Sequence, residues 1–406
     1  MLCPRSPRSA QGAGSSGADL GIATTFWSIT HGAGWDLTDL ELLVGADAFW
    51  RRARSDIDAA QRRLFVQAMT FEGDSVGLTV AAAVAASPAQ DRRVLVDAYT
   101  RFTVSDRSVN SLAGRLSPEV RAEVRSTDAM FRDLVARGVG ARVTNPVGPL
   151  MIHYPARNHK KLIVADDVAY IGGINFSDHN FAWRDFMLRL EGAKAADFLA
   201  ADFEATFAGK ARADRISLPE LSIFSLDGRT NSKVFATISQ LLATAREQID
   251  VLSAYLTFPV ADALAEAVRR GVSVRLITPL ANNKPLVRDY LLALAGRAGF
   301  EVRLLPQMSH LKGMLIDNET LVVGSSNFDF VSLAAEEEFV AVSESPALID
   351  GFRQQIIEPA LADALPLGAH KASFLSGLAA TASLRIADVV ARSARNAPRG
   401  ATDWPG

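Results

Sequence analysis

The chain has 406 residues, 49% of them hydrophobic, and a formal net charge of −2. Its length exceeds what one compact core usually holds, so we expect roughly two domains. The near-neutral charge argues against a general nucleic-acid binder, which usually carries a strong basic excess. The only cysteine is Cys3, which excludes a disulfide framework within the chain and argues against thiol catalysis.

Residues 1–40 are predicted to be a disordered leader and an N-terminal extension. Residues 1–21 are rich in Ser, Gly and Arg and lack the apolar core of a secretory signal, although an organellar transit peptide shares their Arg and Ser bias. The chain contains no run of about eighteen or more consecutive apolar residues, the length that a membrane-spanning helix requires.

Residues 41–215 are predicted to form a first α/β lobe. Its expected elements are strand 64–71, helix 76–86, strand 93–98, one or two amphipathic helices in 115–138, and strand 140–144. The strands are short apolar runs bounded by turn residues, and the helices have apolar residues at helical spacing. This strand–helix–strand order predicts parallel pairing in an α/β layer.

Residues 216–365 repeat this order and are predicted to form a second lobe. Its expected elements are helix 234–246, strand 249–255, helix 260–270, strand 272–277, helix 286–298 and strand 300–305. Late in each half, a strand at 185–191 or 338–344 precedes a helix. Because the period is far longer than that of a solenoid repeat, the sequence predicts two duplicated α/β lobes.

One motif, His-x-Lys-x4-Asp, follows the third predicted strand of each half. Its members are His159, Lys161 and Asp166 in the first half and His310, Lys312 and Asp317 in the second. Each copy is followed by a glycine-containing turn and an asparagine, Asn175 or Asn327. A single match would arise by chance in roughly one chain in twenty of this size. Two matches in a duplicated fold indicate one shared site rather than two exposed polar hairpins.

The residue types of the motif suit phosphoryl chemistry. Residues two apart in an extended strand point to the same side, so each histidine shares a face with its lysine. A neutral imidazole is a nucleophile or a general acid/base near neutral pH, and the lysine supplies positive charge for a phosphate. Asn175 and Asn327 can donate amide hydrogens to the same oxygens. Catalysis would rest on positioning and charge stabilisation, without a metal or another cofactor.

The aspartates of the motif belong to the candidate catalytic set by pattern, but their positions indicate another role. Asp166 and Asp317 follow their histidines by seven residues, which places them on the opposite face of a flat strand. Each begins a turn-like pair, Asp166-Asp167 or Asp317-Asn318. We therefore expect both side chains to cap turns.

At these motifs the sequence resembles the phospholipase D superfamily, over residues 60–358. The segments Gly172-Gly173-Ile174-Asn175 and Trp183-Arg184-Asp185 look most like the bacterial cardiolipin synthase branch. The resemblance implies two lobes related by a pseudo-twofold axis, with one shared active site at their interface. It also implies a phospholipase D-type phosphodiesterase or phosphatidyltransferase that acts on phospholipids.

The resemblance further implies a two-step transfer through a phosphohistidine. One histidine attacks the phosphodiester while the other protonates the leaving alcohol and then activates water or another alcohol. By position His159 is expected to be the nucleophile and His310 the acid/base, and the near-symmetry of the site leaves the reverse open. Glu338 is expected to reach His159, with Glu337 as its competitor, and Asp185 to reach His310.

Residues around the motifs carry weaker expectations. Arg157 is a candidate for the substrate phosphate, with a salt bridge as the alternative. Glu72 and Asp74 are predicted to be turn residues rather than pocket lining, and Trp183 to be a core residue. Val331 stands where the cardiolipin synthase branch has arginine, so the motifs leave the choice of substrate open.

Residues 366–406 stand outside the repeat and are predicted to form an amphipathic, basic tail. Apolar residues recur at helical spacing from Phe374 to Val390, and nearly all the charge is Lys or Arg. Such a helix suits an anionic membrane surface, although we favour a helix docked on the protein body with a basic outer face. We expect a monomeric, cytoplasmic protein, peripheral on the inner face of the membrane, whose partner is a phospholipid and not a nucleic acid.

Two other functions compete with lipid chemistry. A nuclease or other phosphodiesterase of the same superfamily is disfavoured by the near-neutral charge and by the absence of a long basic stretch interleaved with aromatic residues. A non-catalytic lipid-binding protein is disfavoured because both His/Lys pairs are intact.

Overall fold

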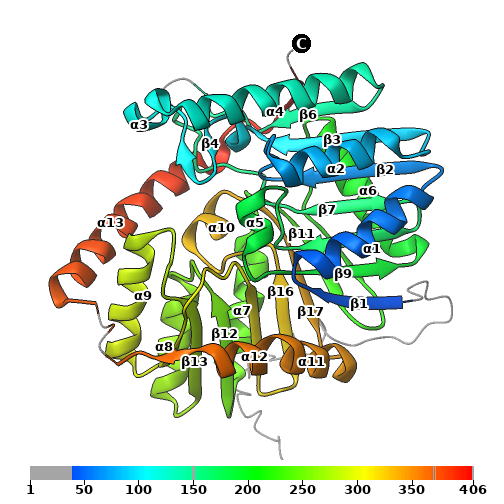
Figure 1. The fold of residues 1–406 in the computed structure, drawn as a ribbon. Helices are drawn as coiled ribbons and strands as arrows, with labels where there is room; N and C mark the ends of the chain where they lie inside the picture. Colours follow the sequence, from blue (N-terminus) through cyan, green and yellow to red (C-terminus); the bar gives the residue numbers. More distant parts are fainter. Residues whose placement is uncertain (1–38, 149–150, 369, 371, 405–406) are drawn as a thin grey trace, which may run out of the picture. The chain divides into compact units, whose positions relative to one another are not determined.

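The computed structural model describes residues 39–406 except 149–150, 369, 371 and 405–406. The predicted leader at 1–40 therefore lies almost wholly outside the described residues. The described part belongs to one compact unit, built as two α/β lobes with a sheet in each (Figure 1). The predicted α/β class and its duplicated lobes are confirmed.

The first lobe is built on an eight-stranded sheet. Its strands, in spatial order, are β1 (Asp39–Val44), β9 (Phe186–Glu191), β8 (Val168–Gly172), β7 (Leu162–Ala165), β2 (Arg63–Ala68), β3 (Asp91–Asp97), β6 (Gly140–Thr144) and β19 (Ala401–Asp403). Strands β2, β3 and β6 pair in parallel, as the strand–helix–strand order predicts, and the other pairs are antiparallel.

The helices of the first lobe lie on both faces of its sheet. They are α1 (Ala46–Ala59), α2 (Ser75–Ala86), α4 (Pro118–Ala136), α5 (Asp178–Ala182) and α6 (Ala193–Phe207). Helices α1, α2 and α4 share one apolar core with the sheet, and α6 packs on the other face. Between β3 and α4 the chain inserts four short elements. These are η1 (Ala98–Arg101), β4 (Thr103–Val104), β5 (Arg107–Ser108) and α3 (Leu112–Leu116).

The second lobe has a nine-stranded sheet. Its strands, in spatial order, are β10 (Asp214–Ser217), β11 (Ser222–Asp227), β17 (Glu337–Ser343), β16 (Thr320–Gly324), β15 (Lys312–Ile316), β12 (Gln248–Ser253), β13 (Ser273–Pro279), β14 (Glu301–Leu305) and β18 (Leu365–Pro366). The parallel set β12, β13 and β14 corresponds to β2, β3 and β6 of the first lobe. Likewise β15, β16 and β17 repeat β7, β8 and β9.

The remaining helices belong to the second lobe and the chain end. They are α7 (Ser232–Thr244), α8 (Val260–Arg269), α9 (Pro285–Ala298), α10 (Phe330–Ala334), α11 (Pro346–Phe352), η3 (Arg353–Ile357), α12 (Glu358–Asp363), α13 (Phe374–Ser393) and η4 (Ala394–Asn396). An apolar core containing α6 and residues of both sheets runs through the two lobes. The lobes are therefore joined by a common core and not only by a linker.

Two backbone contacts hold the start of each motif against the other lobe. The backbone N–H of His159 donates to the carbonyl of Glu337 (2.9 Å), and that of His310 donates to the carbonyl of Arg184 (2.8 Å). Isolated bridges pair Asn158 with Glu337 and Arg184 with Ser309 in the same sense. The two contacts are equivalent under exchange of the lobes, which places the repeated motifs around a pseudo-twofold axis.

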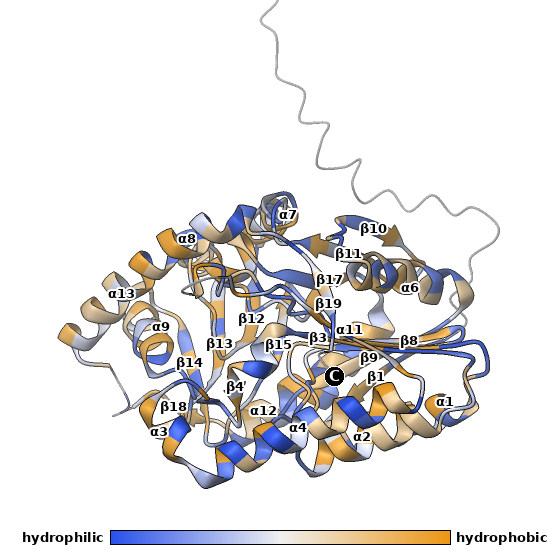
Figure 2. Ribbon diagram, turned by 90° about the horizontal axis from the view of Figure 1, so that it is seen from above, coloured by the Kyte–Doolittle hydropathy of each residue, from blue (hydrophilic) through white to orange (hydrophobic). Residues whose placement is uncertain are grey.

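The C-terminal segment contacts both lobes. Helix α13 packs against α9 and α10 of the second lobe, and strand β19 then pairs with β6 of the first. The helix is docked, as the favoured alternative predicts, but its outer face is apolar rather than basic (Figure 2). Among the described residues, Phe374–Asn396 is a helix long and apolar enough to cross a membrane by length and composition alone.

Candidate active site

The two motif histidines lie together where the lobes meet. The ring centroids of His159 and His310 are 6.5 Å apart, and both side chains are almost completely buried. Each histidine immediately follows the bridge that fixes it to the opposite lobe. The duplication of the fold thus brings two residues 151 positions apart in the chain into one site.

Each imidazole is bound by a carboxylate from the opposite lobe. His159 Nδ1 is 3.0 Å from Glu338 Oε1, and His310 Nδ1 is 2.8 Å from Asp185 Oδ2. Because an ionised carboxylate can only accept, each Nδ1 carries a hydrogen and donates it. Each Nε2 is then unprotonated when the ring is neutral and is available to the pocket. Glu337, the competitor of Glu338, instead accepts from Asn145 Nδ2 (2.8 Å).

Burial keeps both histidines neutral at neutral pH. It lowers the pKa of His159 to about 4, against the opposing effect of Glu338. Burial, together with Lys312 and Lys161, holds the pKa of His310 well below its usual value. A neutral imidazole with Nδ1 protonated is the form that can act as a nucleophile or a base through Nε2.

The two motif lysines are also buried between the lobes. Lys161 Nζ donates to the carbonyl of His159 (2.7 Å), and Lys312 Nζ makes the same contact with His310. Burial lowers the pKa of Lys161 to about 7 and that of Lys312 to about 8, although Glu338 and Asp185 oppose the effect. The site therefore holds positive charge that strengthens below these pH values and that suits a phosphate.

The two orienting carboxylates have different surroundings. Glu338 also accepts hydrogen bonds from the hydroxyl groups of Ser332 (2.9 Å) and Ser325. Burial raises its pKa, but His159 and Lys161 outweigh burial and hold the pKa below its usual value. For Asp185, burial prevails over Lys312 and raises the pKa to about 6.

Gly173 makes room for the second of these carboxylates. A Cβ at position 173 would lie 2.2 Å from Asp185 Oδ1, a distance that no side chain could tolerate. The Gly-Gly turn in the first motif thus serves close packing against the carboxylate that orients His310.

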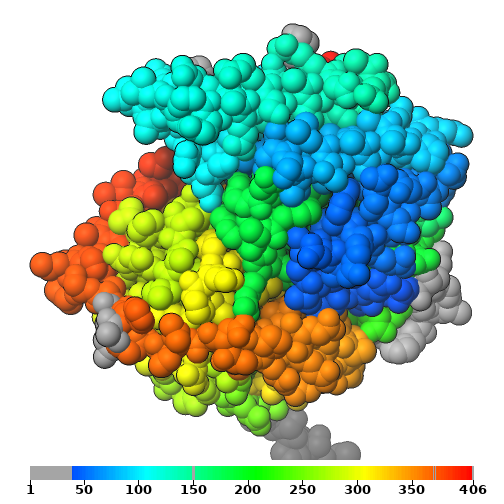
Figure 3. Space-filling view, in the orientation of Figure 1, coloured from blue at the N-terminus to red at the C-terminus, as the bar shows by residue number. Residues whose placement is uncertain are grey.

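A pocket opens onto the two histidines. Asn175 and Asn327 line it, as do the rings of Trp183 and Tyr255, whose centroids are 5.6 and 5.9 Å from that of His310. Its further lining residues are Met69, Thr70, Glu72, Tyr99, Thr103, Asp106, His179, Asn180, Asn283, Lys284, Val287, Asp329 and Glu336. Figure 3 shows the face where the insert (cyan), α5 (green) and α9 (yellow-green) come together.

The motif aspartates lie outside this pocket. Asp166 accepts hydrogen bonds from the backbone N–H groups of Gln61, Arg62 and Arg63. Asp317 accepts from those of Arg246, Glu247 and Gln248. Both aspartates have positive φ in the turn after their strand. Their place in the catalytic set was therefore wrong: each fixes the turn between two strands to the start of a neighbouring strand.

Other expectations also need correction. Arg157 does not reach the pocket: its Nη1 lies 2.7 Å from Asp97 Oδ1 in a buried ion pair. Glu72 lines the pocket, whereas Asp74 caps α2 through the N–H of Gly77 (2.9 Å). Trp183 lines the pocket and is not a core residue.

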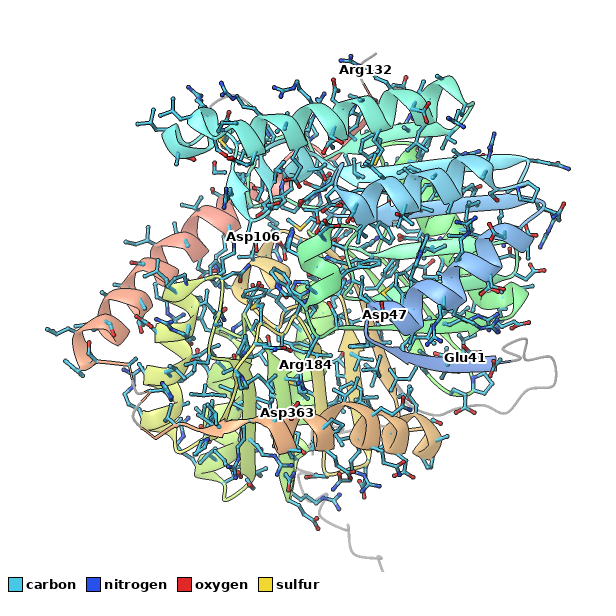
Figure 4. All side chains as sticks on the ribbon, in the orientation of Figure 1. Glu41, Asp47, Asp106, Arg132, Arg184 and Asp363 are labelled. Carbon is cyan, nitrogen blue, oxygen red and sulfur yellow. The ribbon has the colours of Figure 1, made fainter. Side chains whose placement is uncertain are left out.

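Several lining residues were missed from the sequence. Tyr255 donates its hydroxyl hydrogen to Asn283 Oδ1 (2.6 Å), and Asn283 Nδ2 donates to Asp106 Oδ2 (3.0 Å) across the lobe interface. Figure 4 shows Asp106 in the turn of the insert. These residues stand singly in loops and belong to no motif. The only available signal was their position at or beyond the carboxyl ends of predicted strands, where α/β pockets open.

Two groups of side chains among the described residues have donor atoms close enough to hold a cation. They are His159 with Glu336 and Glu338, and Glu72 with Asp74 and Glu123. In the first group Glu338 is already bound by His159 and two serines, and Lys161 lies beside it. The positive charge of Lys161 opposes a metal ion at this position.

Comparisons of the sequence agree with the motif. Residues 238–358 match a family described as "Cardiolipin synthase, PLD-like domain". Minor cardiolipin synthase ClsB of Bacillus subtilis is 30% identical over 226 residues, which cover 50% of this chain and 56% of that protein. Cardiolipin synthase B of Escherichia coli K12 is 28% identical over 334 residues, or 74% of this chain and 75% of that protein.

Solved structures share the fold. Phosphatidylserine synthase of Haemophilus influenzae superposes with a TM-score of 0.67 at 14% identity, over 87% of this chain and 94% of that one. Polyphosphate kinase of Porphyromonas gingivalis gives a TM-score of 0.51 at 13% identity, over 86% of this chain and 53% of that one. The sequence is therefore similar to those of bacterial cardiolipin synthases, and residues 238–358 match their phospholipase D-like domain.

Proposed function

We propose that the chain is a phospholipase D-type enzyme that transfers or hydrolyses the phosphatidyl group of phospholipids, in the manner of a cardiolipin synthase. The observation that carries the proposal is the pair of facing histidines, each oriented by a carboxylate of the other lobe. Lys161, Lys312, Asn175 and Asn327 surround them with donors for phosphate oxygens. The phospholipid class rests on the similarity to proteins named cardiolipin synthases.

The reaction proceeds in two displacements at phosphorus. In the first, Nε2 of His159 attacks, the bond from phosphorus to the leaving alcohol breaks, and His310 gives the departing oxygen a proton. In the second, His310 takes a proton from an acceptor hydroxyl, whose oxygen attacks phosphorus as the phosphorus–nitrogen bond breaks. Water as the acceptor yields phosphatidic acid, and an alcohol yields a new phospholipid.

The unequal carboxylates support this assignment of the histidines. Glu338 is held ionised by His159, Lys161 and two serines, so it fixes one tautomer of His159 with Nε2 free for attack. The pKa of Asp185 is about 6, raised by burial, so the Asp185–His310 pair can change its proton count near neutral pH. A group that must release and recover a proton in each turnover needs that property.

The entering substrate also prepares His310 to act as an acid. Besides burial, the charges of Lys312 and Lys161 depress the pKa of His310 in the empty site. A phosphodiester anion bound between the lysines offsets this repulsion, so His310 can carry a proton in the complex. We place the enzyme peripherally at a membrane, where its substrate lies.

Trapping the covalent intermediate tests the proposal. A phosphatidyl ester of p-nitrophenol needs little acid assistance, so H310A should accumulate a phosphatidyl adduct on the peptide containing His159, measured by mass spectrometry after a rapid quench. H159A should form none. An adduct on His310 in H159A would show that His310 is the nucleophile. Full turnover of phosphatidylglycerol by either variant would contradict a mechanism that needs both histidines.

A product assay separates the proposed activity from its alternatives. Mixed phospholipid vesicles are incubated with and without glycerol or ethanol. Phosphatidic acid alone indicates hydrolysis, and a phosphatidyl alcohol indicates transfer. Cleavage of single-stranded DNA with no change in any phospholipid would favour the nuclease alternative.

A further inference from the structure

Helix α13 buries mainly small side chains against the protein and exposes its large apolar ones. Its buried residues are Gly377, Ala380, Leu384, Asp388 and Ala391, of which only Leu384 is a large apolar residue. Its other large apolar residues point outward, with exposures of 75, 74, 55, 68, 68 and 49% for Phe374, Leu375, Leu378, Ile386, Val389 and Val390. A surface helix of a soluble protein shows the reverse arrangement.

Small residues hold the helix close to the body. A Cβ at Gly377 would lie 2.3 Å from the Cβ of Ala293 on α9, so α9 and α13 approach more closely than larger side chains permit. Interfaces of small residues with large apolar side chains turned away are typical of helices that contact lipid. The docked side and the apolar side are opposite faces of one helix, because they differ by about half a helical turn.

The charges on α13 identify the partner that its outer face fits. Arg385 and Arg392 are exposed at 54 and 60% and lie along one flank of the apolar face. The one acidic side chain of the helix, Asp388, is turned inward and paired with Arg392 at 2.8 Å. Arg385 also lies 3.5 Å from the exposed carboxylate of Asp262 on α8. Apolar side chains flanked by arginines, on a helix that itself exposes no carboxylate, complement an anionic phospholipid surface.

We propose that the outer face of α13 lies in the surface of an anionic bilayer and holds the enzyme there. The choice of a bilayer over a second copy of the chain rests also on the proposed phospholipid substrate. The helix lies along the surface rather than spanning the membrane, because α9 and α10 cover its inner face and β19 returns the chain to the first lobe.

Helix α9, on which α13 packs, extends from α13 to the pocket. This helix begins at Pro285, between the pocket residues Lys284 and Val287, and Leu286 beside them is 52% exposed. Figures 1 and 3 show α13 crossing α9 and projecting from the edge of the body. A bilayer in contact with α13 would therefore lie next to α9, the helix whose first turn borders the pocket.

Vesicle binding by a triple variant tests the proposal. Full-length L378S/I386S/V389S should bind phosphatidylglycerol-containing vesicles at least about tenfold more weakly than the parent chain in co-sedimentation. The matched control L78S/V135S removes two residues exposed at 46 and 48% elsewhere and should bind as the parent does. Unchanged binding by the triple variant would overturn the proposal.

Two further readouts separate the possible failures. Turnover of a short-chain phospholipid, dispersed as monomers, should be equal in the parent and the triple variant, since only attachment is lost. If neither the parent nor the triple variant turns over this phospholipid while their vesicle binding still differs, the membrane-binding role of α13 is supported and the proposed function is contradicted. A dimeric parent and a monomeric triple variant in light scattering would overturn the proposal in favour of a second copy on this face.

A fluorescent reporter checks the result without weakening the face. I386W should show a blue shift of its emission on adding anionic vesicles, and quenching by brominated lipid. Emission unchanged by vesicles would contradict insertion of this face.

Discussion

Each lobe brings one histidine to the pocket with a lysine buried beside it, but the two lobes support this pair differently. Glu337, which contacts the backbone of His159, is buried and bound by Asn145. Arg184, its counterpart at His310, is partly exposed and forms an ion pair with Asp363 at the surface (Figure 4). The two lobes thus share the residue types of the motif, whereas the residue next to each orienting carboxylate differs between them. Matched substitutions can therefore separate catalytic roles from structural ones.

The largest effect is expected from neutralising the two orienting carboxylates. E338Q removes the anion that fixes the tautomer of His159 and should lower turnover by roughly 100-fold or more. D185N should cost a similar factor with a natural phospholipid, because His310 then loses its role as acid and base. With the p-nitrophenyl ester, D185N should retain the first burst of p-nitrophenol, and E338Q should lose it.

A third variant controls for nonspecific damage in this comparison. Asp166 accepts hydrogen bonds from three backbone N–H groups away from the pocket. D166N should therefore lower the unfolding free energy by about 1–3 kcal/mol while the rate of the folded enzyme stays within about threefold. Loss of the burst in D185N but not in E338Q would exchange the roles of the two lobes.

The next effect concerns the pH dependence of anion binding. Burial lowers the pKa of Lys161 to about 7 and that of Lys312 to about 8, so each ammonium loses its proton as the pH rises through these values. The inhibition constant of sulfate, whose charge is constant over this range, should rise roughly tenfold between about pH 6 and 9. K210M, altered at an exposed lysine, should leave the profile unchanged. A flat profile in the parent enzyme would show that both lysines keep their charge.

A smaller effect is expected from the arginines behind the two carboxylates. Arg399 is buried, donates to the carbonyl of Ala335 (2.7 Å) and lies 3.9 Å from Glu337. R399Q should lower the unfolding free energy by about 1–3 kcal/mol and reduce kcat several-fold with little change in KM, since Ala335 and Glu337 lead directly to Glu338. R184Q loses only a surface pair and should cost less than about 1 kcal/mol. If chemical denaturation showed the same loss of unfolding free energy in R399Q and R184Q, this difference between the lobes would be contradicted.

The sequence predicted the catalytic core more fully than the pocket around it. The spacing of His159 and Lys161 predicted their common face. The resemblance to the phospholipase D superfamily, together with the aligned strands of the two halves, pointed to Asp185 and Glu338. Tyr255 and Asn283 were missed because each is a single residue outside the motifs, and only the pairing of β12 with β15 brings Tyr255 next to His310. Nor does the sequence reveal that the chain end joins the first sheet, since β19 pairs with a strand about 260 residues away.

Sequence patterns also predicted the wrong role for some residues whose type is compatible with two different environments. Arg157 could bind a substrate phosphate or a buried carboxylate, and only the position of Asp97, 60 residues earlier in the chain, decides for the ion pair. Helix α13 was expected to be basic outside. Its arginines instead flank an outer apolar face, because glycine and alanine take the side that packs on α9.

The smallest effect is expected where the lobes differ most. Glu336 precedes Glu338 by two residues, and its counterpart in the first lobe is Trp183. Burial, with the nearby charges of Glu338 and Asp329, holds the pKa of Glu336 well above its usual value and so favours the neutral form of this carboxyl group. E336Q replaces the carboxyl group by a neutral amide of the same shape, and steady-state turnover should stay within about threefold if the neutral form is the one present.

The same side chain decides whether the site can use a metal ion. If Glu336 were an ionised ligand together with His159 and Glu338, E336Q would abolish activity and EDTA would inhibit the parent enzyme. The raised pKa of Glu336 and the adjacent Lys161 predict instead that EDTA leaves turnover unchanged and that added Mn²⁺ or Zn²⁺ does not restore any variant. The positive charge that a metal would bring is then supplied once by each lobe, through Lys161 and Lys312.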